Sequence, residues 1–343
     1  MVGALLGLKT TGKNRAVENP PLILVGCSGG PDSLALAAVC AFFARRGEVR
    51  VGAVVVDHQM QEGSAGVAQN TAAQLVELGL DPVVVRTVDL EHDGVGPEAA
   101  ARAARFGALE ATAVKLGAAH VLLGHTLDDQ AESVLLGLAR GSGTRSLAGM
   151  RARRGRYLRP FLGLRREETL EICGALGLEP WHDPSNQDPA YLRVRVRNHV
   201  IPFLQDQLGP GIAESLARSA SILGRDADFL DELAAAEYGK LVQRDREEPG
   251  GKGDIAQISL AEDALRGLAP ALRMRVLALA AVELGGVQPS LERLGAAEKL
   301  LAREGSAGPV ELAGKVRVWR QPRNRPGPHE AASYGKLVLR RNT

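Results

Sequence analysis

Short apolar runs alternate with longer amphipathic segments through the first half of the chain. The apolar runs carry hydrophobic residues on both faces, which is typical of buried strands in a parallel sheet. The longer segments between them have the periodicity of helices. This alternation predicts an α/β fold in which helices cover both faces of a parallel sheet. The strands are expected at 22–26, 51–56, 82–88 and 121–124, and the helices at 33–46, 66–78, 97–116, 128–139 and 170–176.

The strand signal fades after about residue 190. Residues 197–240 and 259–302 have the pattern of helices, and a glycine-rich stretch from 247 to 253 separates them. Towards the end of the chain, short alternating pieces indicate a small β segment. We therefore expect a lead-in, an α/β domain, a small helical domain and a short basic β-like tail. Their expected bounds are 1–20, 21–200, 201–308 and 309–343.

The net charge of the chain is only +2, but the charges are distributed unevenly. Between residues 140 and 166, which we call the arginine belt, there are nine arginines and no acid. From residue 315 onward there are eight lysines or arginines against one acid, whereas residues 226–263 contain eleven acids against four bases. Such an asymmetry indicates a polyanionic partner.

The three cysteines, Cys27, Cys40 and Cys173, lie in apolar contexts, and none forms a C-x-x-C pair. This is the pattern of buried thiols in a reducing compartment. No apolar run approaches the length of a membrane span, and the short apolar start of the chain lacks the features of a signal peptide. The sequence therefore predicts a cytoplasmic protein that does not contact a membrane.

The segment Ser28-Gly29-Gly30-Pro31-Asp32-Ser33, called here the phosphate loop, connects the first expected strand to the first expected helix. Small residues allow a tight turn in which several backbone N–H groups point at one place, and a helix N-terminus adds its partial positive charge there. This pattern predicts a phosphate site at the carboxyl end of the strand. The alternative is an ordinary helix start, capped by Ser28 or Asp32.

Asp32 would repel a phosphate in this loop unless a cation lay between them, so its presence indicates Mg²⁺. A second glycine-lysine segment, from Gly7 to Asn14, nearly fits the phosphate-binding pattern G-x-x-x-x-G-K-S/T. However, Asn14 replaces the hydroxyl that would hold Mg²⁺, and two prolines interrupt the helix that should follow. We therefore expect the phosphate loop at 28–33 to be the functional one.

A second group of ionisable residues follows the fourth expected strand. In a helix that begins near Asp128, Glu132 shares a face with both Asp128 and Asp129. Two carboxylates are tolerated at a helix N-terminus, and the third indicates a bound cation, either Mg²⁺ or an ammonium group. The alternative is a capping box in which one aspartate caps the helix and Glu132 reaches back. That alternative does not account for His125.

The string Ser-Gly-Gly-x-Asp-Ser resembles the PP-loop of the ATP pyrophosphatases, which cleave ATP between its α and β phosphates and pass AMP to a substrate oxygen. The motif His-x-x-Asp-Asp-x-x-Glu at 125–132, followed by Arg-Gly-Ser-Gly, is similar to the tRNA(Ile)-lysidine synthetase family. Phe106 and Ser133 depart mildly from its usual tyrosine and threonine, and longer members carry a further C-terminal domain. Other segments that resemble this family are 98–106, 159–168, 181–202 and 268–275.

The resemblance implies a PP-loop fold, followed by a small helical domain that binds tRNA, and a ligase reaction that forms a C–N bond. ATP adenylates the C2 oxygen of the first anticodon cytidine of tRNA(Ile), whose anticodon is CAU. The side-chain amine of free L-lysine then displaces AMP, and the product, lysidine, changes codon recognition from AUG to AUA. ATP and Mg²⁺ are thus the expected cofactors, and tRNA(Ile) and lysine the expected partners.

The resemblance also implies roles for individual residues. Pyrophosphate is expected at the phosphate loop and His125, with Asp32 and Asp129 as the best candidates for Mg²⁺. The attacking amine must be neutral, so a carboxylate should hold and deprotonate it, and Asp129 and Glu132 are the candidates. Arg102 is the candidate for binding the lysine carboxylate or a phosphate. Its alternative is a solvated helical arginine.

The arginines fit a track for the tRNA backbone, with a solvated basic face as the alternative. Three other functions remain open: a PP-loop enzyme that inserts sulfur into tRNA, a non-catalytic tRNA-binding protein, and an amidotransferase-type synthetase. The missing C-x-x-C pair argues against the first, the retained acids against the second, and the arginine belt against the third. The expected tRNA contacts are Arg140, Arg145, Arg151, Arg153, Arg154, Arg193, Arg195 and Arg197.

Overall fold

The protein folds into two compact units, Met1–Gly224 and Arg225–Thr343, and the boundary falls within helix α10 (Ile212–Leu241). None of the helices in the described residues combines the length and apolar character needed to cross a membrane. The computed structural model describes residues 1–7, 18–59, 61, 63–89, 97–246, 255–302, 307–321 and 335–342.

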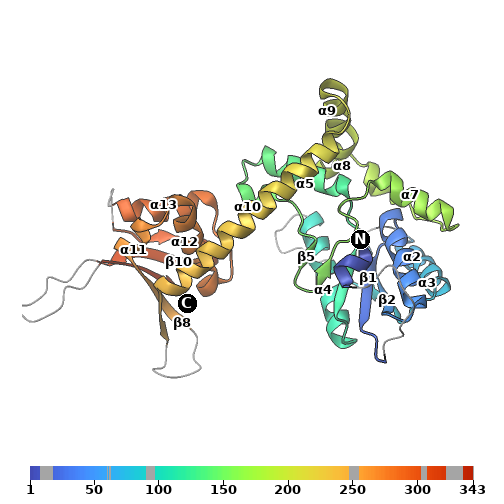
Figure 1. Ribbon diagram of the computed structural model, residues 1–343, viewed down its shortest axis with the longest axis horizontal. Helices are drawn as coiled ribbons and strands as arrows, with labels where there is room; N and C mark the ends of the chain where they lie inside the picture. The colour runs from blue at the N-terminus through green and yellow to red at the C-terminus, as the bar shows by residue number, and fades with distance from the viewer. Residues whose placement is uncertain are drawn as a thin grey trace, which may run out of the picture. The chain divides into compact units, whose positions relative to one another are not determined.

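The first unit is built on a six-stranded sheet in the order β3-β2-β1-β4-β6-β5. Figure 1 labels β1, β2 and β5 of this sheet. Neighbouring strands are parallel except for β5 and β6, which pair antiparallel. The parallel sheet predicted from the apolar runs is therefore confirmed. The two short strands at the edge belong to the arginine belt and have no apolar run that could reveal them. The strands are β1 Leu22–Cys27, β2 Arg50–Asp57, β3 Val83–Thr87, β4 His120–Leu123, β5 Arg153–Arg154 and β6 Tyr157–Leu158.

Helices cover both faces of this sheet, as the strand composition requires. On one face α2 and α3 enclose a core that includes Leu36 and Leu75, and α7 packs against α2. On the other face α4 packs Leu109 and Ala113 against the strands. The helices are α1 Val2–Leu6, α2 Pro31–Arg45, α3 Ser64–Glu77, α4 Pro97–Lys115, α5 Leu127–Ala139, α6 Thr144–Leu147, α7 Arg166–Ala175, η1 Pro184–Gln187, α8 Leu192–Arg195, the π-helix η2 Val196–Val200, and α9 Ile201–Leu208.

The strand order reverses between β1 and β4. From β1 the chain builds β2 and β3 on one side, and it then returns to place β4 on the other side of β1. At this point the loops that follow β1 and β4 lie next to each other at the carboxyl edge of the sheet. In open α/β folds, ligands bind in the crevice between two such loops. The phosphate loop follows β1, and residues 124–129 follow β4. The topology thus brings together the two groups of residues that the sequence singled out.

The start of the chain differs from the expected loose lead-in. Residues 2–6 form helix α1, and the Val2 side chain is buried in the same core as Phe43. The apolar residues at the start are therefore part of the packing of the first unit. Residues 8–14 of the second glycine-lysine segment lie outside the described residues.

The second unit contains an antiparallel five-stranded sheet in the order β7-β8-β11-β10-β9. Leu277 of α12 and Leu300 of α13 share one core with Leu260 and Val318 of the strands. The expected helical region and β-like tail therefore belong to one unit, in which helices and sheet share a single core. The sequence did not reveal β7 because most of its residues are exposed and charged. The elements are β7 Val242–Arg246, β8 Ile255–Ala261, α11 Glu262–Gly267, α12 Pro270–Gly285, α13 Leu291–Ala302, β9 Val310–Glu311, η3 Ala313–Lys315, β10 Val316–Gln321 and β11 Lys336–Arg341.

Candidate active site

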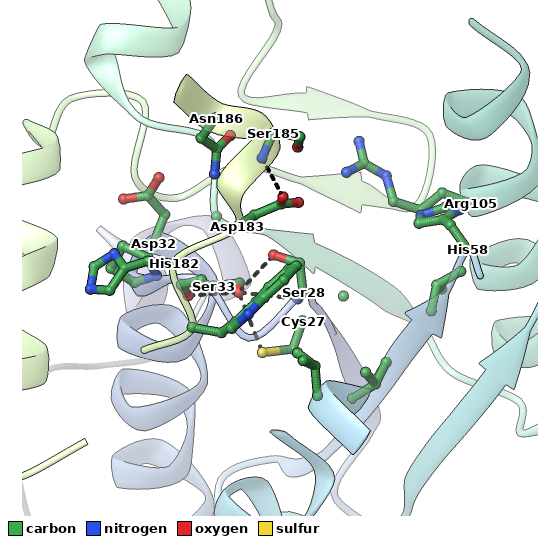
Figure 2. Close-up of a pocket in the computed structure, with 18 of the residues that line it drawn as sticks. Cys27, Ser28, Asp32, Ser33, His58, Arg105, His182, Asp183, Ser185 and Asn186 are labelled. Atoms are coloured by element: carbon green, nitrogen blue, oxygen red, sulfur yellow. Dashed lines mark hydrogen bonds between the residues drawn. The ribbon is translucent and has the colours of Figure 1, made fainter. Parts of the chain in front are cut away.

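A cavity of about 990 Å³ lies at the carboxyl edge of the parallel sheet. The phosphate loop forms part of its wall, together with residues that follow β2 and β4 and residues from α4 and α7. Figure 2 shows Arg105 and His58 on one side of the cavity, and Asp32 and His182 on the other. The cavity therefore joins the two sequence-predicted groups with residues from β2, α4, α7 and other segments.

The phosphate loop is held from within by Ser33. Its hydroxyl accepts a hydrogen bond from the Ser28 N–H (3.1 Å) and donates one to the Gly30 carbonyl oxygen (3.0 Å). Gly29 has φ +83°, and a Cβ there would lie 2.5 Å from the hydroxyl of Thr71. Helix α2 begins after Gly30 without a side-chain cap, so the proposed capping by Ser28 or Asp32 is not observed. The first N–H groups of α2 are thus available to a bound anion.

The segment from 181 to 187 closes another side of the cavity. The Trp181 N–H donates to the carbonyl oxygen of Gly29 (2.9 Å) and ties this segment to the phosphate loop. Asp183 accepts hydrogen bonds from the Ser185 N–H and from the side chain of Gln61, both at 2.8 Å. Asp183 therefore holds the turn, whereas its neighbour Asn186 is free to face the cavity (Figure 2).

Asp32 and Asp129 contact the same guanidinium group. Arg166 Nε lies 3.3 Å from Asp32 Oδ2, and Arg166 Nη2 lies 3.2 Å from Asp129 Oδ1. The Thr169 hydroxyl donates to the other Asp32 oxygen at 2.5 Å. Burial raises the pKa of Asp32, although Arg166 and Thr169 oppose this effect. The cation that the sequence required beside Asp32 is thus supplied by a side chain of the protein itself.

Asp129 also fixes the start of helix α5. Its Oδ2 accepts hydrogen bonds from the Thr126 N–H (2.8 Å) and the Thr126 hydroxyl (3.2 Å). A capping box is therefore present, but Thr126 and Asp129 form it, and Glu132 takes no part. Burial acts to raise the pKa of Asp129, but the charge of Arg166 and the Thr126 N–H outweigh it and lower the pKa. Asp129 is therefore an ionised carboxylate on the cavity wall.

Glu132 is fully buried and lies behind the cavity wall rather than on it. Arg197 donates to both of its carboxylate oxygens, at 2.6 and 3.2 Å, and Arg193 Nε lies 3.2 Å from Oε2. Arg197 comes from the π-helix η2, a type of helix that often occurs at functional sites. Glu132 therefore forms ion pairs with two arginines that were expected to bind tRNA, and it does not line the cavity.

Replacement of Glu132 by alanine is expected to lower the free energy of unfolding by about 2–3 kcal/mol. Breaking a fully buried ion pair costs about 3–5 kcal/mol, and the partial exposure of both arginines reduces that cost. Chemical denaturation of the purified protein measures the change. Glu171→Ala, which removes an exposed carboxylate on α7, is the matched control and should change stability by less than about 0.5 kcal/mol. Equal stability of the two variants would contradict the importance of this ion pair.

Arg105, rather than Arg102, reaches the cavity wall. Arg102 is largely exposed, and its guanidinium lies 5.2 Å from the centre of the Phe106 ring. Burial and the neighbouring Arg102 and Arg193 lower the pKa of Arg105 to about 10, and its buried Nε has no hydrogen-bond partner in the described structure. Burial also lowers the pKa of His125, which is therefore neutral. Arg105 therefore places a positive charge on the cavity wall, within electrostatic range of Asp129.

The arginines expected to bind tRNA fall into two groups. Arg195 is exposed and donates to the carbonyl oxygens of Pro189 and Ala190, whereas Arg193 and Arg197 point inward to Glu132. In the arginine belt, Arg145 is half-buried and the remaining expected contacts are exposed. The exposed arginines of the belt are accessible to a polyanion. They are Arg140, Arg151, Arg153 and Arg154.

Two families of protein domains match this chain. Residues 8–204 match the PP-loop domain, and residues 260–322 match the TilS substrate binding domain. A U34-tRNA thiolase of Methanococcus maripaludis has a similar structure, with a TM-score of 0.50 over 61% of this chain and 74% of that chain. The two sequences are only 19% identical, so this similarity concerns the fold alone. Together with the match to the PP-loop domain, it confirms the PP-loop type of α/β fold.

Curated relatives are similar over most of the chain. The tRNA(Ile)-lysidine synthase of Leifsonia xyli subsp. xyli is 51% identical over 300 residues, which cover 88% of this chain and 87% of the relative. The tRNA(Ile)-lysidine synthase of Thermobifida fusca is 48% identical over 317 residues, which cover 91% of this chain and 94% of the relative. Together with the two matching domain families and the geometry of the cavity, these similarities show that the chain belongs to the tRNA(Ile)-lysidine synthase family.

Proposed function

We propose that this chain ligates L-lysine to C2 of the first anticodon cytidine of tRNA(Ile), with ATP as the adenylating substrate. The main observation in support of the proposal is that the phosphate loop and Asp129 line the same cavity. This cavity lies where the order of the strands reverses. An anion site next to a carboxylate is what an adenylation followed by an amine attack requires. Membership in the family supports this choice of substrates.

The triphosphate of ATP binds along the phosphate loop and the start of α2, where uncapped N–H groups meet the helix dipole. The adenosine lies over the end of β2, because the cavity continues there along Val55 and Val56 to His58. This places the α-phosphorus near the middle of the cavity. The C2 oxygen of cytidine attacks it there, and pyrophosphate leaves towards the loop.

We also propose that Mg²⁺ binds together with ATP. Within the described residues, no group of three or more histidine, cysteine, aspartate or glutamate side chains could hold a metal ion. Asp32 and Asp129 supply two carboxylates, and Mg²⁺ commonly binds through one or two carboxylates together with substrate phosphates. The donor set therefore fits an ion that arrives with the nucleotide. When bound, the ion would neutralise charge on the phosphates.

The lysine side chain binds at Asp129. An ionised carboxylate with a lowered pKa holds an ammonium group well but accepts its proton poorly. In the second step, when pyrophosphate and the ion that accompanies it would have left, Asp32, whose pKa is raised by burial, is the better proton acceptor. The carboxylate of lysine is directed to Arg105 on the cavity wall. Glu132 acts only indirectly, because it orients Arg197 next to Asp129.

The exposed arginines of the belt bind the tRNA backbone. The double replacement of Arg153 and Arg154 by alanine is expected to weaken tRNA binding about tenfold and to reduce the slope of affinity against salt by about 1–2. Filter binding over a salt series measures both, and ATP binding should not change. Arg50→Ala is the matched control, because this exposed arginine lies at the amino end of β2. Equal salt slopes for the two variants would contradict the proposed track.

Labelled lysine provides the test of the reaction. The protein is incubated with labelled lysine, ATP, Mg²⁺ and bulk tRNA, and the tRNA is then digested to nucleosides. The proposal predicts label in one modified cytidine, which should disappear when ATP is omitted. A tRNA fraction that gains no label would contradict it. Since tRNA, ATP and free lysine occur together in the cytoplasm, the proposal places the reaction there.

A further inference from the structure

Arg166 lies where a cation bound to Asp32 and Asp129 would lie. It is the first residue of α7, and its backbone N–H donates to Asp128 at 2.8 Å, which fixes the base of the side chain. The guanidinium then reaches Asp32 at 3.3 Å and Asp129 at 3.2 Å and forms part of the cavity wall. Two carboxylates that would repel each other are therefore held together by one internal positive charge.

A guanidinium and a divalent cation cannot share this position. Both are positively charged and need the same carboxylate oxygens, so the presence of one opposes the other. Phosphates offer the guanidinium another partner, because their oxygens accept paired N–H donors as carboxylates do. Thr169 and Arg197 retain their contacts to Asp32 and Asp129 if Arg166 moves away. The two carboxylates would then remain oriented towards the vacated position.

We propose that Arg166 is an exchangeable counter-ion that excludes a divalent cation from the nucleotide-free cavity. When ATP binds, the Arg166 side chain moves from the two aspartates to phosphate oxygens, and the metal that accompanies ATP takes its place. Arg166 is thus a positioning residue that makes metal binding dependent on nucleotide. This inference rests on the proposed function only in taking ATP with a divalent cation as the ligand.

The test measures Mn²⁺ binding to the full-length protein without nucleotide, by electron paramagnetic resonance of the free ion. The wild-type protein should bind Mn²⁺ weakly, and Arg166→Met should bind it at least about tenfold more tightly, because a nearby positive charge has been removed. Addition of Asp32→Asn to that variant should reverse the gain. Arg165→Met is the matched control, because Arg165 pairs with Asp128 and Glu214 and is not part of the cavity wall. It should resemble the wild type.

Equal Mn²⁺ affinity of folded Arg166→Met and wild-type protein would overturn the inference. If Arg166→Met does not fold, Arg166→Gln replaces it, since the amide retains hydrogen bonds without the charge. The wild type alone also tests the inference, because Mn²⁺ binding that is equally tight with and without a non-hydrolysable ATP analogue would contradict it. Lysidine formation by the wild type tests the proposed function separately, so that either can fail alone.

Discussion

Replacement of Asp129 by asparagine is expected to lower the rate of lysidine formation by about 10²-fold, the size of effect that misplacing a reacting group has. The carboxylate faces the cavity and carries the charge that would hold the lysine ammonium group. Asparagine can still accept the hydrogen bond from the Thr126 N–H, so helix α5 should begin at the same residue. Single-turnover transfer of labelled lysine to tRNA measures the rate, and gel shift measures tRNA binding, which should not change.

Asp128 provides the matched control for this variant. It neighbours Asp129 in the sequence, but it accepts hydrogen bonds from Arg165 and from the Arg166 N–H, away from the cavity. Asp128→Asn keeps an acceptor oxygen and should lower the rate by less than about fivefold, as is usual for a change that leaves the reacting groups in place. Similar rates for the Asp128 and Asp129 variants would remove Asp129 from its proposed role.

Replacement of Gly124 by alanine is expected to lower turnover by about 10²-fold, because a displacement of about 1 Å at a reacting site has effects of this size. A Cβ at this position would lie 2.7 Å from the carbonyl oxygen of Asp32 and 2.8 Å from its carbonyl carbon. Both are backbone atoms, so the end of β4 must move away from the phosphate loop. The overpacking should also reduce the free energy of unfolding by about 1–3 kcal/mol.

Single-turnover lysine transfer measures the fall in turnover, and chemical denaturation measures the fall in stability. Isothermal titration measures the weaker ATP binding that displacement of the loop should also cause. Gly163→Ala is the matched control, since a Cβ there would meet nothing within 4 Å. It should leave ATP affinity and stability unchanged within error. Normal ATP affinity in Gly124→Ala would show that the close approach of the β4 loop to Asp32 is unimportant for the site.

The first unit could be predicted from the sequence to within a few residues of each major element. Its strands are apolar on both faces because helices cover both, so the pattern of the sequence reports the layers directly. The strand from 22 to 27 and the glycines after it also placed the phosphate loop correctly at the carboxyl edge of the sheet. The second unit was harder, because β7 exposes charged residues and because β8 pairs with β11, which lies far away in the sequence.

The candidate site was only partly predictable, for a physical reason. Spacing along a helix indicates which residues share a face, but it does not show which side chain of another segment meets them. Glu132 shares a helix face with the cavity residue Asp129, yet Arg197 from η2 buries it in ion pairs. Arg166 lay in a recognised segment, but its partners Asp32 and Asp129 are brought to it only by the fold. Arg105, one helical turn from Arg102, could have been found as a second candidate.

The adenylation step is tested most directly by following the AMP group before lysine is present. The protein is incubated with tRNA(Ile) and ATP that is labelled in the α-phosphate, and lysine is omitted. Label should accumulate on the first anticodon cytidine, and pyrophosphate should be released in equal amount. Added lysine should then discharge the label as free AMP. Release of ADP, or transfer of the label to lysine instead of tRNA, would contradict the claim that this cavity adenylates a tRNA base.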